Sequence, residues 1–133
     1  RLRKMQAALE EFNGDLAALC RAASWETIEI EPDLNITAGG RSYSMLSPRG
    51  SERYRVRAII QIATAMRDGS AAVILDGADI LDGPHGTGLM RLLIDAWQRP
   101  ALVCKTVSPG QNIPDLAGKG LGRSYRIDAG RIV

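Results

Sequence analysis

The stretch that most constrains the fold is residues 46–82, LSPRGSERYRVRAIIQIATAMRDGSAAVILDGADILD. A Ser/Gly/Glu/Arg cluster opens a segment whose apolar residues recur at helical spacing, so we expect an amphipathic helix from about Ser51 to Arg67. After an Asp-Gly-Ser turn, residues 71–75 are all apolar. That run predicts a central strand covered on both faces and ending at Asp76. The helical face consists of Val56, Ile59, Ile60, Ala63 and Met66.

Both halves of this stretch suit nucleotide chemistry. A helix N-terminus with small polar residues offers backbone N–H groups and a partial positive charge to a phosphate. A carboxylate at the C-terminal end of a buried strand is a usual place to hold Mg²⁺ or to orient a water. Each feature also has a plainer interpretation: Ser51 and Glu52 can simply cap the helix, and Asp76 can simply form a turn.

The flanking segments complete an α/β pattern. Apolar residues in the first 23 positions are spaced 3, 4, 3, 4, 3, which is typical either of a coiled coil or of a helix packed on a domain core. The order of helix, antiparallel strands and then helix–strand–helix–strand predicts a parallel pair with an antiparallel edge. We expect strands at 28–30, 34–37, 43–46 and 101–106, a break at 84–88, a helix at 89–97, a loop at 108–122 and a terminal hairpin of 124–127 with 131–133.

Composition bounds the class of protein. The chain has 133 residues, is 45% hydrophobic and 24% charged, and carries a net charge of +2, as an ordinary globular domain does. Cys20 and Cys104 lie far apart without metal-ligand spacing, and His85 is the only histidine, so we expect a reducing, cytoplasmic setting. No apolar run or signal pattern predicts a membrane partner. Because the chain begins with Arg1, we expect a piece of a longer protein.

With these motifs in place, the chain resembles the C-terminal lobe of an ABC-type ATPase head of the SMC kind, as found in chromosome-maintenance and recombination-repair ATPases. Residues 1–23 correspond to the returning end of the coiled-coil arm, and residues 24–133 to the lobe itself. Within the lobe, 46–53 correspond to the signature region, 72–76 to the Walker B strand and 80–82 to the D-loop. The terminal RIDAGRIV is similar to the last hairpin of such heads.

The resemblance implies a P-loop NTPase-like fold, with ATP and Mg²⁺ bound between two heads and hydrolysis coupled to work on DNA. It implies that Asp76 holds Mg²⁺ through water and that Asp79 is the nearest candidate to orient the attacking water. The implied partners are an N-terminal Walker A lobe of the same protein, a second head and DNA. The implied contacts to the γ-phosphate of the opposite head come from the signature residues Ser47, Gly50, Ser51, Glu52 and Arg53.

The chain departs from the family pattern at several positions. Gly77 stands where the family places a glutamate after the Walker B aspartate, and Arg49 stands where it places the signature serine. The switch histidine expected after the strand at 101–106 is absent, and the chain has no GxxxxGK[ST] loop. Two alternatives therefore stay open: a catalytically impaired interaction or dimerisation module derived from an ATPase, and an unrelated small α/β binding domain.

Overall fold

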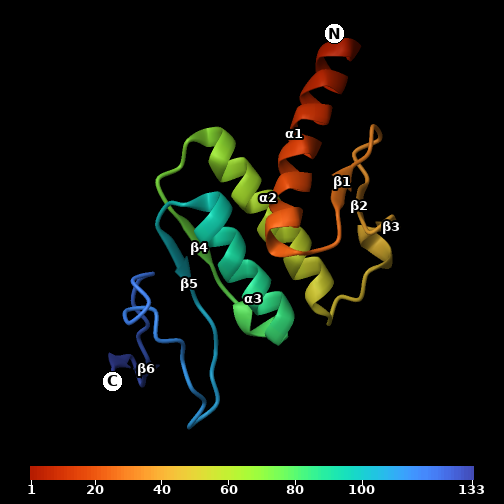
Figure 1. The fold of residues 1–133 in the computed structure, drawn as a ribbon. Helices are drawn as coiled ribbons and strands as arrows, with labels where there is room; N and C mark the ends of the chain where they lie inside the picture. The colour runs from red at the N-terminus through yellow and green to blue at the C-terminus, as the bar shows by residue number, and fades with distance from the viewer.

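The computed structural model describes residues 1–133 and has three α-helices with three small sheets (Figure 1). Helix α1 packs its C-terminal half against α2, α3 and strand β1. The mixed α/β class expected from the sequence is confirmed at this level. The helices are α1 (Leu2–Ala23), α2 (Ser51–Asp68) and α3 (Gly83–Leu92), and the strands of the first two sheets are β1 (Ile28–Ile30), β2 (Ile36–Ala38), β3 (Arg41–Ser42), β4 (Val73–Leu75) and β5 (Ala101–Val103).

Helix α1 is buried at one end and free at the other. Leu16 and Leu19 belong to the core, whereas Leu2 and Met5 on the same heptad seam are 69% and 61% exposed. The N-terminal half accordingly projects past the rest of the molecule (Figure 1). The seam therefore serves as a core face at its C-terminal end and stays uncovered at its N-terminal end.

The antiparallel strands β1, β2 and β3 form a sheet of their own rather than the edge of the parallel pair. The strand predicted at 43–46 is wrong, because the return strand is β3 and Tyr43–Met45 form a single 3₁₀ turn, η1. Gly39 and Gly40 both have positive φ, 56° and 79°, so the chain reverses directly after Ala38 and the return strand begins early.

Strands β4 and β5 pair in parallel, with Ile74 opposite Leu102. Val73 and Leu75 point into the core, but Ile74 is 63% exposed and Leu102 is 57% exposed. The expectation that this strand is covered on both faces is therefore wrong. The helices cover one face only, and β5 has no second neighbour in the sheet.

Helix α3 begins where the sequence predicted a break. Asp82 is its N-cap and accepts a hydrogen bond from the His85 backbone N–H at 3.0 Å, and Pro84 occupies the first turn, where its missing N–H costs nothing. Gly88 lets the helix approach α1 closely, because a Cβ there would lie 2.3 Å from the Ala23 carbonyl oxygen. The helix then widens into a π-turn, η3 (Leu93–Trp97).

The chain ends in a small antiparallel hairpin, β6 (Ile127–Asp128) with β7 (Arg131–Ile132), which confirms the predicted terminal hairpin. It lies apart from the helices, near the C-terminus (Figure 1), and its strand residues are exposed. Among the three helices, none combines the length and the apolar character needed to cross a bilayer.

Candidate functional site

The C-terminal end of β4 meets the first half of α2 at an open groove of about 460 Å³. Tyr54, Arg57 and Gln61 of α2 line one side, and Asp76 lies on the other. The Gln61 amide donates to the Ile74 carbonyl oxygen at 2.8 Å and so occupies the edge of β4 that faces away from β5. The groove also includes Ala58, Ile74, Leu75, Gly77 and Ile80.

Asp76 directly follows β4, as the sequence predicted, and its side chain is exposed at the groove. Its Oδ1 accepts the Gly77 backbone N–H at 2.8 Å, and no hydrogen bond engages its second oxygen. No cluster of three or more potential ligand residues surrounds it. One open carboxylate fits a cation that takes most of its ligands from phosphates and water, as Mg²⁺ does.

The next residues of the turn, Gly77 and Asp79, shape the turn and hold it in place. Gly77 adopts φ +71°, in the left-handed region, where a side-chain-bearing residue is strained. Asp79 lies in the 3₁₀ turn η2 (Ala78–Ile80), and its Oδ1 accepts the Thr106 backbone N–H at 3.2 Å. The Asp79 carboxylate therefore ties the turn to the segment that follows β5.

The start of α2 is held by a turn rather than by a side-chain cap. The Ser47 carbonyl accepts the Gly50 N–H at 3.3 Å, and the Ser47 hydroxyl accepts the Arg49 N–H at 3.3 Å. Gly50 is the N-cap residue, and no side chain accepts a hydrogen bond from the N–H groups of the first turn. These groups, beside Ser51, keep their capacity to bind an anion.

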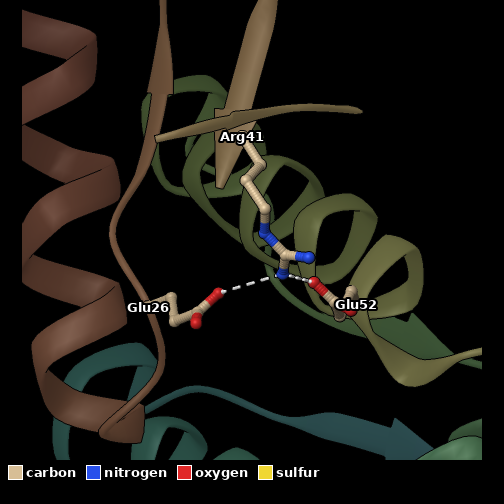
Figure 2. Close-up of polar contacts among 3 residues, drawn as sticks. All are labelled: Glu26, Arg41 and Glu52. Carbon is tan, nitrogen blue, oxygen red and sulfur yellow. Dashed lines mark hydrogen bonds and ion pairs between the residues drawn. The ribbon is translucent and has the colours of Figure 1, made fainter. Parts of the chain in front are cut away.

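The side chains of Glu52 and Arg53 are both engaged within the chain. Figure 2 shows Arg41 of β3 between two carboxylates: it hydrogen bonds to Glu52, and its Nη2 lies 4.0 Å from the Glu26 Oε2. The Arg53 guanidinium stacks 4.9 Å from the Tyr43 ring centroid and donates to the Ser44 carbonyl at 3.3 Å. Both side chains thus fasten the first turn of α2 to the antiparallel sheet and η1.

Tyr54 is the residue of this region that sequence reasoning missed. It is 9% exposed, and its hydroxyl is buried without a hydrogen-bond partner. Burial raises the pKa of the phenol, and the negative charge of Asp76 raises it further. The predicted apolar face did not include it: the structure buries Tyr54 with Ala58, Ile62 and Ala65 on an adjoining side of α2, whereas Met66 of the predicted face is exposed.

The residues predicted to bind nucleotide and Mg²⁺ therefore form two separate groups in the structure. Asp76 and Asp79 share one short turn at the end of β4, while Ser47, Gly50 and Ser51 form the start of α2 and do not line the groove. Glu52 and Arg53 lie in the same first turn of α2 but are engaged in holding it. Neither a protein-family model nor a characterised protein matches the chain.

Proposed function

We propose that this chain is the C-terminal half of an SMC-like ATPase head. The observation that carries the proposal is the β4–β5 pair, which is covered by helices on one face and open on the other. Parallel strands are found almost only in sheets covered on both faces. An uncovered parallel pair with an exposed Ile74 and Leu102 is what a lobe separated from its other half presents.

The missing half is an N-terminal lobe carrying the Walker A loop, which adds to the free edge of β5 and covers the open face. Burying a fully exposed Leu or Ile contributes about 1.5–3 kcal/mol. Ile74 and Leu102 are each more than half exposed, so covering both contributes about 2–4 kcal/mol to docking of the lobe. The projecting end of α1, with Leu2 and Met5 exposed, is in this proposal the end of the coiled-coil arm.

In this proposal the chain's own residues contact the hydrated Mg²⁺ and the phosphates. Asp76 presents its free carboxylate oxygen to the water shell of Mg²⁺, which would neutralise phosphate charge when ATP is bound. Ser47, Gly50 and Ser51 offer the start of α2 to the γ-phosphate held by a second head. Asp79 is the candidate to orient water, and DNA is the substrate on which the complete protein works.

A non-catalytic interaction module is the second candidate, and two observations favour it. The left-handed φ of +71° at Gly77 disfavours the glutamate that the family places there. Asp79, its only near substitute, is engaged with the Thr106 N–H. In this alternative the complete protein binds nucleotide and dimerises without turning ATP over.

ATP turnover by the complete protein, with both lobes and both heads present, separates these candidates. Asp76→Ala and Asp79→Ala are each compared with Asp68→Ala, which removes an exposed acid at the far end of α2. Loss of turnover in Asp76→Ala, with Asp68→Ala unaffected, supports the ATPase. Unchanged turnover in both site variants refutes the assigned roles, and nucleotide binding without any turnover in the parent favours the interaction module.

A further inference from the structure

The Tyr54 hydroxyl is a buried polar group that the proposed roles leave unused. The side chain is 9% exposed, and its hydroxyl lacks a hydrogen-bond partner. Buried hydroxyl groups in folded proteins are almost always paired. Because leaving a buried hydroxyl unpaired costs about 1–3 kcal/mol, the Tyr54 hydroxyl calls for an acceptor.

The residues around the phenol belong to the turn that follows β4. Tyr54 lines the same groove as Asp76 and Gly77. A Cβ on Gly77 would lie 3.9 Å from the Tyr54 Cε2, so the ring faces this turn with room for about one added carbon atom between them. After burial, the largest influence on the phenol pKa is the negative charge of Asp76, ahead of Asp79.

Asp76 also has a carboxylate oxygen that is free to accept a hydrogen bond from the Tyr54 hydroxyl. Its side chain is exposed, and only one of its oxygens is held, by the Gly77 N–H. Asp79 instead uses its carboxylate to hold the segment after β5 and does not line the groove. Asp76 is therefore the carboxylate of this groove whose side chain is free to turn toward the phenol.

We propose that Tyr54 is a positioning residue for Asp76: its hydroxyl donates a hydrogen bond to the free carboxylate oxygen and fixes the direction in which the carboxylate points. A carboxylate held on one side by the Gly77 N–H and on the other by a phenol has one orientation rather than several. The hydrogen bond can be tested in the chain as it stands, whereas its consequence for a cation rests on the proposed function.

The test of the hydrogen bond is ultraviolet resonance Raman spectroscopy of tyrosine, whose ring doublet changes when the hydroxyl becomes a strong donor. Tyr43→Phe and Tyr125→Phe together leave Tyr54 as the only tyrosine. We expect the donor signature in this background, its loss in Asp76→Ala and its retention in Asp79→Ala. A spectrum that Asp76→Ala leaves unchanged, or that only Asp79→Ala alters, overturns the proposal.

The consequence is tested in the complete ATPase with Tyr54→Phe, which keeps the ring and its packing. A hydrogen bond to a charged group is worth enough that its loss raises the Mg²⁺ concentration for half-maximal turnover about tenfold. Tyr125→Phe, in the exposed segment before the hairpin, is the matched control. An unchanged Mg²⁺ requirement in Tyr54→Phe overturns the positioning role. Absence of turnover in the parent overturns the proposed ATPase and leaves the Raman result to decide the hydrogen bond.

Discussion

Replacing Gly88 with Ala is expected to separate α3 from α1, because the two helices meet backbone to backbone at this residue. An added Cβ would lie 2.3 Å from the Ala23 carbonyl oxygen and 2.8 Å from the Trp25 indole nitrogen. An ordinary carbon–oxygen contact is about 3.4 Å or more. The first clash involves main chain, so rotation of a side chain cannot relieve it, and α3 must move by about 1 Å.

The expected loss of stability follows from two opposing terms. Forcing an extra carbon into a packed core costs about 1–3 kcal/mol, and a backbone neighbour puts Gly88→Ala near the upper end. Alanine in place of glycine inside a helix returns about 1 kcal/mol. The net loss is about 2 kcal/mol, or a fall of roughly 6–10 °C in Tm for a domain of this size.

Gly86→Ala in the same helix is the matched control, since nothing lies within 4 Å of a Cβ at that position. It keeps the helix-propensity gain of about 1 kcal/mol without the clash. Urea unfolding followed by circular dichroism should therefore place the two variants about 3 kcal/mol apart, on opposite sides of the parent. Equal stabilities for Gly88→Ala and Gly86→Ala would refute the close α1–α3 approach.

Three further outcomes follow from individual contacts. The Asn13 side chain accepts the Ile30 N–H at 2.8 Å and donates to the Ile30 carbonyl at 2.9 Å. Asn13→Ala should therefore lower the free energy of unfolding by about 1–3 kcal/mol in urea titrations, whereas Asn112→Ala, at an exposed position, should leave it nearly unchanged. Cys20 is buried, and burial raises the pKa of its thiol. A thiol reagent should therefore label the half-buried Cys104 first and should label Cys20 only when the protein unfolds. The hydrogen bond from the His85 backbone N–H lowers the pKa of the Asp82 carboxyl below its ordinary 3.8. The stability that the ionised Asp82 contributes is therefore complete above pH 3.8 and is lost as the pH falls below that value. Urea unfolding above and below that pH should show a weaker acid dependence in Asp82→Asn than in the parent.

The helix at the centre of residues 46–82 was predictable because its information is local. Helical spacing of apolar residues, a turn after the last periodic position and an apolar run before Asp76 require no knowledge of neighbours. The structure places α2 at Ser51–Asp68 and β4 immediately before Asp76, as expected. The parallel pairing of β4 with β5 also followed, because a strand–helix–strand order favours it.

The predictions that were wrong concern how elements pack against one another in the tertiary structure. Pro84 and three glycines argue against a helix by propensity, yet α3 forms because Asp82 caps it and Gly88 is required for its packing on α1. Likewise, an all-apolar strand predicts cover on both faces, and only the tertiary arrangement reveals that Ile74 is exposed. Neither fact can be read from the residues in the segment itself.

The sequence alone therefore determined the order of the elements and the position of a carboxylate after an apolar strand, since both depend on neighbours along the chain. Tertiary structure decided how that carboxylate is placed. It set the left-handed Gly77 beside it and engaged Asp79 with the Thr106 N–H. It also placed Tyr54 of α2, whose hydroxyl is buried, in the same groove as that carboxylate. The physical reason is that hydrogen-bond partners and burial are properties of contacts between segments far apart in the chain, which local pattern does not encode.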